Sequence, residues 1–518
     1  MTEVNPAPVV SPPRRLSGLL PWAVLLGGAV LFRLPALINS RGVHSDAAIV
    51  GLQAMHLLQG EWSWFLWGAG YQASFDALLI ALGFAVFGSS ALVLMVVPLL
   101  GHLACVGLAY DALRRWVSPG AAVFACLPLV FAPQAINGVA LYAPRQWSIT
   151  AVFLAVWLVS RSVGASRPVP WLIAGGFFAG FALYLDLFAL QLMLGFGVFA
   201  LACSAAPLRP ARGLLTRVGG LWAGALLGAL LVAWSRSQPM ADAAKTTLSL
   251  ERLGPNARLL WETCLPWLLG TKVFIPGERL YPDLWVPPWP VVLLQWVALG
   301  SVLVAVLGAG VAVLMPKVAP PVRRAALLGV GITASSVGGF LVSSMPSDMW
   351  SARYLAPIVW FLPFTLAPVA GWLGERKFGL ALAPYLVVAA IGGWLAFGPY
   401  VQGPLPVRTA RGVAEDEAEV ARVLREKGVT HAAAQYWLSY RLGFLFQESP
   451  VVIPLAAWED RYPPYRAGFQ QAPVVAYLFH PSEPRASPVP YEAQLRAAGA
   501  RYERLETRGF TVLIHHRR

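Results

Sequence analysis

The chain has 518 residues, of which 57% are hydrophobic and only 12% are charged. An ordinary soluble protein carries about 25% charged residues, so a chain this poor in charge cannot cover a water-facing surface and must be solvated largely by lipid. The net charge of +14 lies in short clusters between apolar runs, which excludes a basic nucleic-acid-binding stripe, so we expect no nucleic-acid partner.

A membrane-spanning helix needs about 20 mostly apolar residues, and about eleven runs qualify or nearly qualify. These predicted spans are residues 17–38, 91–112, 119–136, 147–161, 170–186, 187–206, 218–235, 290–314, 325–344, 354–373 and 379–398. The apolar stretch 77–87 is too short, and we place it in a long first outer loop from 39 to about 90. We therefore predict an all-α polytopic membrane domain over residues 1–400.

Orientation follows from Lys and Arg in short loops, which favour the cytoplasm. Arg14 and Arg15 place the N-terminus inside, and eleven spans place every later basic cluster inside as well. If 77–87 also crossed, the cluster at Arg114 and Arg115 and all later ones would fall outside. We expect a multi-pass plasma (inner) membrane protein whose partners include membrane lipids and whose C-terminal domain is extracytoplasmic.

The composition changes after about residue 400. Residues 401–518 hold 15 Lys or Arg and 12 Asp or Glu of the 64 charged residues in the chain. An amphipathic helix is predicted at 415–427 and a second helix at 491–498, with β-like runs at 451–453, 474–479 and 510–514. This pattern predicts a small C-terminal α/β domain over 401–518, acting as a lid or docking module.

The first outer loop concentrates polar and aromatic side chains. It opens with His44, Ser45 and Asp46 before residues at helical spacing, so Ser45 or Asp46 could cap that helix. His44 is explained equally by a plain loop position. Further along, Trp64 suits either the membrane interface or a sugar platform, as Tyr71 does.

Three more polar residues of this loop are candidates for substrate binding. Glu61 follows the predicted helix and could equally be surface. Gln72 lies in the motif described next. Asp76 opens the short apolar stretch, where the helix dipole alone favours an acid.

These residues carry a family resemblance. His-Ser-Asp after the first span, the helix ending Leu-Leu-Gln-Gly-Glu, and the stretch from Gly68 to Ala77 resemble the start of the GT-C superfamily of membrane glycosyltransferases. Phe-Gly-Ser-Ser-Ala-Leu at 87–92 and Ser-Ala-Arg-Tyr-Leu-Ala-Pro at 351–357 extend the match. The chain is similar to the branch of protein O-mannosyltransferases and lipid A aminoarabinose transferases.

The resemblance implies an inverting enzyme that takes a sugar from a polyprenyl phosphate donor at the outer face. A lipid, glycan or protein acceptor attacks the anomeric carbon, and a first-loop carboxylate, here Asp46, acts as general base or orients the acceptor. Relatives often carry a second acid in the next outer loop. Here that loop reads Tyr-Ala-Pro-Arg-Gln-Trp from Tyr142 to Trp147, so a two-carboxylate scheme and a divalent cation stay open, and we assign no cofactor.

The leaving group implied by the resemblance is a lipid phosphate, which the planar fork of Arg binds well. Arg353 matches the late arginine of the family, and Arg145 at the end of a span is a second candidate. Either could instead be an interfacial arginine that reaches the headgroups. Tyr354 could support the phosphate or belong to the aromatic belt, and Asp348 is a binding candidate or a plain loop acid.

Two other functions remain open at this point. A transporter or flippase for a lipid-linked saccharide would show paired repeats and acids near the bilayer midplane, whereas here the acids cluster outside. A membrane assembly factor would use the C-terminal domain as its binding part. The sequence therefore favours a glycosyltransferase.

Overall fold

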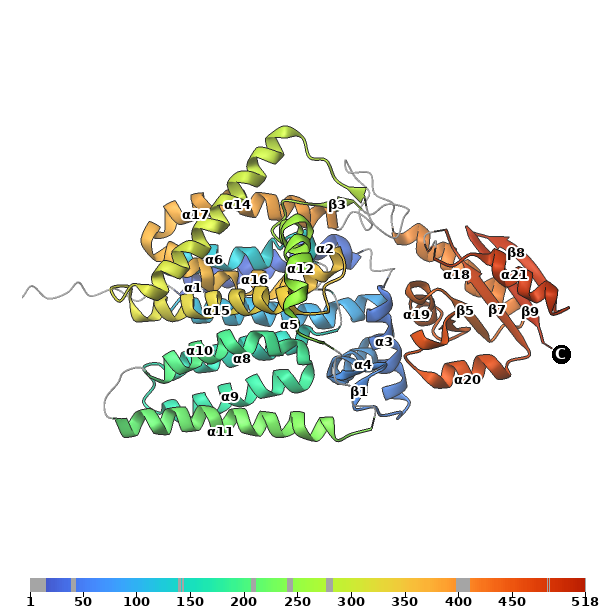
Figure 1. Cartoon of the computed structure of the whole chain (residues 1–518), viewed down its shortest axis with the longest axis horizontal. Coiled ribbons are helices and arrows are strands. Elements are labelled where there is room, and N and C mark those ends of the chain that lie inside the picture. The colour runs from blue at the N-terminus through green and yellow to red at the C-terminus, as the bar shows by residue number, and fades with distance from the viewer. Residues whose placement is uncertain are drawn as a thin grey trace, which may run out of the picture.

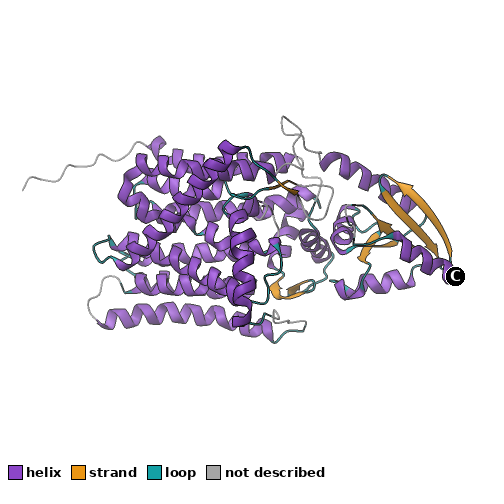
Figure 2. Cartoon of the chain, turned by 45° about the horizontal axis from the view of Figure 1, so that its top comes forward, coloured by secondary structure: helices purple, strands orange, loops and turns teal. Residues whose placement is uncertain are grey.

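The structure is a computed structural model, which describes residues 15–38, 43–137, 141, 144–205, 211–239, 246–275, 283–396, 410–481, 483 and 485–517. A bundle of long helices lies beside a smaller part that ends the chain (Figure 1). The largest sheet belongs to that second part, while the bundle is mainly helical (Figure 2). The predicted fold class, a helical membrane domain with a small C-terminal α/β domain, is confirmed.

The elements of the bundle follow the chain order. The first half has α1 (Arg15–Trp22), η1 (Ala23–Gly27), α2 (Gly28–Ile38), α3 (Ser45–Leu58), β1 (Phe65–Leu66), β2 (Ala69–Ala73), α4 (Phe75–Phe87), α5 (Ala91–Leu113), α6 (Pro119–Val130), α7 (Gln134–Asn137), α8 (Gln146–Ser162), α9 (Pro168–Leu185), η3 (Leu187–Ala189), α10 (Leu190–Ser204) and α11 (Ala211–Arg236). The second half has η4 (Leu250–Arg252), α12 (Leu253–Leu259), η5 (Leu260–Cys264), α13 (Leu265–Leu268), β3 (Phe274–Ile275), β4 (Asp283–Leu284), α14 (Trp289–Leu314), α15 (Pro320–Val342), η6 (Met349–Leu355), α16 (Ala356–Trp360) and α17 (Leu362–Ala396).

Within the described residues, eight helices are long and apolar enough to cross a membrane. The protein is therefore multi-pass, and the count of eleven spans stays a prediction. The predicted run 119–136 ends early, as the 12-residue α6, and the run 147–161 is the 17-residue α8. The last two predicted runs join in α17, which is interrupted at Gly374, a glycine with φ +70°.

A buried arginine of the first span completes the end of α6. Pro133 has no N–H to donate to the carbonyl of Leu129, four residues earlier, so the helix cannot continue. The fully buried Arg33 donates to that carbonyl at 3.3 Å and to the carbonyl of Val130 at 3.2 Å. The charge inside the bundle is thereby paired with backbone oxygens, as intramembrane charges usually are.

The first long loop folds into α3, the hairpin of β1 and β2, and α4. These elements lie at the end of the bundle that faces the C-terminal part (Figure 1). With 13 residues α4 rises about 20 Å, which is less than the roughly 30 Å of a bilayer core. That 77–87 does not cross stays a prediction, because α6, which lies in a predicted span, is one residue shorter still.

The C-terminal part contains α18 (Ala410–Glu426), β5 (His431–Ala434), α19 (Tyr436–Leu445), β6 (Val451–Pro454), η8 (Ala457–Glu459), α20 (Pro463–Gln471), β7 (Val474–Phe479), α21 (Pro488–Ala497), β8 (Arg501–Thr507) and β9 (Phe510–His516). Its strands form one sheet in the order β6-β5-β7-β9-β8. Strands β6, β5 and β7 are parallel, whereas β9 runs antiparallel to both β7 and β8.

Both predicted helices and all three predicted strand runs are present in this domain, while the short η8 and four other elements were missed. β5 reads His-Ala-Ala-Ala, without the branched residues that mark strands, and β8 is an edge strand of mostly charged or polar residues. The helices α19 and α20 were also missed. Alternate apolar residues on the sheet pack against α18 and α19 on one face, in a core that includes Val420, Leu442 and Val512.

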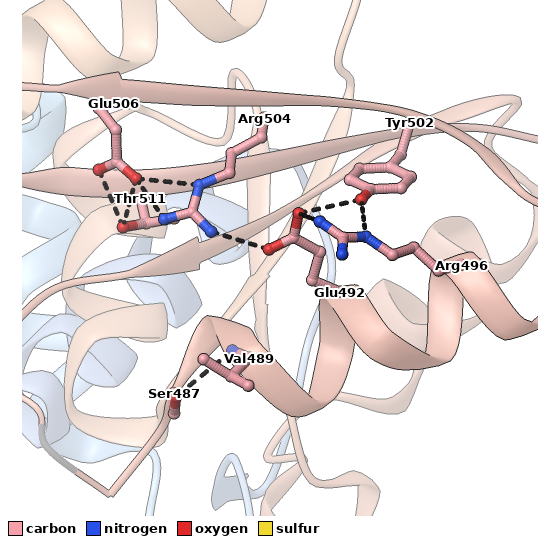
Figure 3. Close-up of polar contacts among 8 residues, drawn as sticks. All are labelled: Ser487, Val489, Glu492, Arg496, Tyr502, Arg504, Glu506 and Thr511. Carbon is pink, nitrogen blue, oxygen red and sulfur yellow. Dashed lines mark hydrogen bonds and ion pairs between the residues drawn. The ribbon is translucent and has the colours of Figure 1, made fainter.

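The edge strand is tied to α21 by a polar network (Figure 3). Glu492, which is 8% exposed, accepts hydrogen bonds from Arg496 at 2.7 Å, Tyr502 at 2.9 Å and Arg504 at 2.8 Å. The Ser487 hydroxyl accepts the N–H of Val489 at 3.3 Å and so caps the start of α21. Glu506 accepts from Arg504 and Thr511.

In the bundle, α9 and α11 pack through glycines spaced four residues apart. A Cβ at Gly224 would lie 1.9 Å from the Ile173 carbonyl oxygen, and one at Gly228 would lie 2.5 Å from Cα of Gly180. Backbones approach this closely in membranes only where side chains are absent. The contact fixes α9, which leads directly into Asp186.

We therefore expect Gly224→Ile to destabilise the protein, because the added side chain meets backbone that cannot move aside. Overpacking of this kind costs about 1–3 kcal/mol or more. The measurement is the midpoint of thermal unfolding of the detergent-purified protein. Gly219→Ile on the same helix is the control, since nothing lies within 4 Å of its Cβ position. Equal midpoints for both variants would contradict the packing.

Candidate functional site

The site is built around the N-terminus of α3. His44 caps this helix, and its Nδ1 accepts the backbone N–H of Asp46 at 3.3 Å. The expectation that Ser45 or Asp46 is the cap is wrong, because the extended residue before the helix is His44. The Ser45 hydroxyl instead donates to the carbonyl of Tyr436 at 3.0 Å. Asp46 lies in the first turn, where the helix dipole favours its charge.

The Asp46 carboxylate is contacted from the C-terminal domain. The Tyr436 hydroxyl on α19 donates to its Oδ1 at 3.0 Å, and the His44 Nδ1 lies 4.0 Å from its Oδ2. The Asp46 side chain is 33% exposed. Arg461, between η8 and α20, donates from Nε to the Tyr436 hydroxyl at 3.2 Å. Asp46, Tyr436 and Arg461 are therefore linked in series by hydrogen bonds.

The His44 ring shows which charges share this region. The ring is 53% exposed, and loss of solvation lowers its pKa. Asp46 opposes this lowering of the His44 pKa, while the positive charges of Arg353 and Arg441 add to it. The charges of Asp46 and Arg353 thus have opposite effects on the pKa of His44.

Arg353 is exposed on η6 and is stacked with its neighbour. Its Nη2 donates to the Tyr354 hydroxyl at 3.1 Å, and its guanidinium carbon lies 4.9 Å from the centre of that ring. Asp348 is the N-cap of η6: its Oδ1 accepts the N–H of Trp350 at 3.0 Å, and Ser351 completes a capping box. Asp348 therefore stabilises the start of η6.

Arg145 is engaged by a different acid. Its Nε lies 3.1 Å from Oδ2 of Asp186, which is 1% exposed, and its guanidinium carbon lies 5.0 Å from the centre of the Phe188 ring. Gln72 pairs with Asp186 through a β-bridge and donates from its side chain to Asp76 at 3.3 Å. The structure thus brings Gln72, Asp76 and Arg145 together, while Tyr142 lies outside the described residues.

Asp76 is buried among these groups. Burial raises the pKa of Asp76 to about 7, and the nearby charge of Asp186 raises it too, whereas the backbone N–H groups of Arg145 and Trp147 oppose the shift. It opens α4, as the dipole argument predicted. A carboxylate held this way is positioned to fasten α4 to the start of α8.

Glu61 belongs to a cluster that joins the first loop to the C-terminal domain. The His56 Nδ1 lies 2.6 Å from Glu61 Oε2, and its Nε2 lies 2.7 Å from Glu448 Oε1. Tyr462 donates to Glu61 and Tyr465 donates to Glu448. The imidazole therefore bridges one carboxylate from each part, which makes Glu61 more than a surface residue.

The aromatic candidates lie apart from this cluster. Trp64 is 39% exposed and packs edge-to-face on Trp62 and Trp234, with ring centres 5.3 Å and 4.7 Å away. Exposed tryptophan clusters of this kind fit the membrane interface. Tyr71 is half-buried against the core that α3 and α4 share with the C-terminal domain.

Sequence reasoning missed Tyr436, Arg461 and Glu448. Tyr436 lies 390 residues from Asp46 in the chain, and no spacing rule connects positions so far apart. Among the residues that the structure describes, no group of three or more His, Cys, Asp or Glu could hold a metal ion. We therefore assign no divalent cation to the site.

The His56 cluster predicts a pH-dependent stability. Burial lowers the pKa of His56, but the hydrogen bonds and charges of Glu448 and Glu61 outweigh it, so the pKa is raised above 6.5. The resulting stabilisation is fully present below about pH 6.5 and is lost as the pH rises through the raised value. The pKa values of Glu61 and Glu448 are lowered, so their contribution is lost only below about pH 4.5.

We therefore expect the midpoint of thermal unfolding to fall as the pH rises above about 6.5, because the bridging imidazole loses its proton. His56→Gln should be less stable at pH 6 and should flatten this dependence. His516→Gln on β9 serves as the control and should keep the wild-type slope, because His516 takes no part in the bridge between Glu61 and Glu448. A slope that survives in His56→Gln would show that other groups cause it.

Comparison with known proteins gives one family and several structures. Residues 73–237 match the family model of dolichyl-phosphate-mannose-protein mannosyltransferase, and no curated protein sequence matches the chain. The crystal structure of ArnT from Cupriavidus metallidurans bound to undecaprenyl phosphate is similar, with a TM-score of 0.60 at 14% identity over 95% of this chain and 98% of that one.

The same ArnT in the apo state gives a TM-score of 0.51 at 14% identity, over 94% of this chain and 98% of that one. At this level of identity the likeness shows the fold, and it extends over almost the whole of both chains. Together with the family match it confirms the resemblance found in the sequence: the chain has the fold of the GT-C superfamily of membrane glycosyltransferases.

Proposed function

We propose that the protein transfers a sugar from a polyprenyl phosphate donor to a lipid, glycan or protein of the cell envelope, at the outer face of the membrane. The observation that carries the proposal is that Asp46 lies one-third exposed at the start of α3, beside the exposed ring of His44 and hydrogen-bonded by the Tyr436 hydroxyl. This transfer needs an accessible acid and a cation that binds phosphate, and we assign the second role to the exposed Arg353. The undecaprenyl phosphate in the similar ArnT crystal structure supports the choice of carrier.

The chemistry is a single displacement. An acceptor hydroxyl or amine forms a bond to the anomeric carbon while the bond from that carbon to the phosphate oxygen breaks, which inverts the configuration. Asp46 orients the nucleophile and takes its proton. The polyprenyl phosphate leaves with an added negative charge, which Arg353 stabilises through charge-assisted hydrogen bonds, and Tyr354 holds that guanidinium in place.

The proposed orientation puts the first loop and the C-terminal domain outside. Basic residues at the opposite ends of the helices support it: Arg114 and Arg115 follow α5, and Arg167 precedes α9. These arginines belong to short loops, where positive charge favours the cytoplasm. The proposed localisation is the plasma (inner) membrane.

The sugar and acceptor are open to direct measurement. Mass spectrometry of envelope glycans, lipids and proteins from cells with and without the protein should reveal one modification that depends on it. That sugar, linked to undecaprenyl phosphate, then becomes the donor for the protein reconstituted in vesicles. Unchanged envelopes together with saccharide counterflow in the vesicles would favour a transporter instead.

We expect Asp46→Asn to abolish transfer while the protein stays folded, because the amide cannot take a proton. A positioned acid or base contributes roughly 10²–10⁴-fold, so the rate should fall by at least about 100-fold. The assay is transfer in reconstituted vesicles. Asp416→Asn, an exposed acid of the C-terminal domain, is the control, and wild-type turnover by Asp46→Asn would refute the role.

We expect Arg353→Ala to weaken use of the donor, since one charge-assisted phosphate contact contributes about 1.5–3 kcal/mol. The KM for the lipid-linked donor should rise about 10–100-fold, and Arg353→Lys should recover part of the loss. Arg258→Ala removes the charge of a 78% exposed arginine paired with Glu262, and it should leave that KM unchanged. An unaltered donor KM in Arg353→Ala would count against this assignment.

A further inference from the structure

We propose that the C-terminal domain completes the site, with Tyr436 as a positioning residue that orients the Asp46 carboxylate and Arg461 as the residue that holds Tyr436. This inference rests on the proposed function and deepens it. It assigns the domain a part in the reaction that a lid or docking module alone would not have.

The hydrogen bonds at the Tyr436 hydroxyl have a fixed direction. A tyrosine hydroxyl has one proton to donate, and the Arg461 guanidinium, which can only donate, fills its oxygen at 3.2 Å. The proton is therefore left for Asp46 Oδ1, 3.0 Å away. Burial raises the pKa of Tyr436, so the hydroxyl keeps its proton at physiological pH.

Arg461 is itself held from three sides. Its backbone N–H donates to the Tyr440 hydroxyl at 2.6 Å, its Nη1 donates to the Gly68 carbonyl at 2.6 Å, and its guanidinium lies over the Tyr436 ring. Gly68 has φ +64°, and a Cβ there would lie 2.3 Å from the arginine side chain. The arginine therefore locks the C-terminal domain onto the hairpin of the first loop.

The helix that carries Tyr436 is docked on the helix that carries Asp46. The Ser45 hydroxyl binds the Tyr436 carbonyl at 3.0 Å, and a Cβ at Gly51 would lie 2.6 Å from the ring of Phe444. Contacts this close leave little freedom for α19 to slide along α3. The Tyr436 hydroxyl is thus delivered to Asp46 by a rigid surface, as positioning requires.

Two consequences follow for Asp46. A donor aimed at one oxygen fixes the plane of the carboxylate, which sets the direction of the other oxygen toward a nucleophile. A hydrogen bond to the charged form also favours that form. Removing the donor should therefore both misorient the carboxylate and make it easier to protonate.

The test is Tyr436→Phe, compared with Tyr440→Phe in the reconstituted transfer assay. Tyr440 lies one turn further along α19 and also binds Arg461, but through the backbone N–H, so it matches the loss of one buried hydroxyl. We expect Tyr436→Phe to lower kcat about 10–100-fold and to move the acidic limb of kcat/KM upward by about one pH unit. The donor KM should stay unchanged. Tyr440→Phe should lower thermal stability and leave the limb in place, because the Gly68 carbonyl and the Tyr436 ring still hold the Arg461 guanidinium.

A second readout does not depend on transfer. A carbodiimide reacts with protonated carboxyl groups, so the pH midpoint of Asp46 modification, followed by peptide mass spectrometry, reports its ionisation. Tyr436→Phe should move this midpoint upward, whereas Tyr440→Phe should not. The inference would be overturned if Tyr436→Phe moved neither the acidic limb of kcat/KM nor the pH midpoint of Asp46 modification. Equal shifts in Tyr436→Phe and Tyr440→Phe would also overturn it.

The two proposals fail in different ways. If the wild-type protein transfers no sugar while the modification midpoint shifts in Tyr436→Phe, the function is wrong and the contact between the domains stands. If wild-type transfer is present and Tyr436→Phe matches it in kcat and pH profile, only the positioning role falls. Arg461→Gln should change kcat and the pH profile in the same direction as Tyr436→Phe. The Tyr436 hydroxyl then loses the guanidinium that donates to it and fixes its orientation.

Discussion

The docking of α19 on α3 is the contact on which the geometry of the site depends. It brings the Tyr436 hydroxyl to Asp46 and, through Arg461, ties the C-terminal domain to the hairpin after α3. It is also where His56 bridges Glu61 and Glu448. Because helix packing, hydrogen bonds and charges all lie in one interface, a change in any of them reaches Asp46.

Asp46 and Asp76, two acids of the first loop, differ in their surroundings and therefore in the roles they can have. Asp46 is a third exposed and receives a tyrosine hydroxyl, so water reaches it. Asp76 is 3% exposed, and burial raises its pKa to about 7. The partners around it, Gln72 and the start of α8, belong to the scaffold. The sequence alone makes both acids candidates for the functional site. Their different burial favours Asp46 for the catalytic role.

The sequence could predict what depends on composition, periodicity and local order. The apolar runs indicated a multi-pass protein, and the motif order indicated the superfamily fold and directed attention to Asp46 and Arg353. The helix cap was assigned wrongly because His44 is a rare cap, and β8 was hidden because an edge strand carries charge rather than branched apolar residues. Tyr436 was out of reach, since its partner lies 390 residues away.

Under the proposed function, the chemistry explains why a folded C-terminal domain would lie beside Asp46. In the proposed reaction a lipid-linked donor enters from the bilayer, and its phosphate needs a cation at the level of the headgroups, the role proposed for Arg353. The nucleophile comes from water and needs a carboxylate that stays ionised and oriented there. Lipid-facing helices cannot supply the polar groups that orient such a carboxylate, because every unpaired polar group in hydrocarbon is costly. A folded domain that packs on the loop can supply them, and Tyr436 with Arg461 is the pair that we propose for this role.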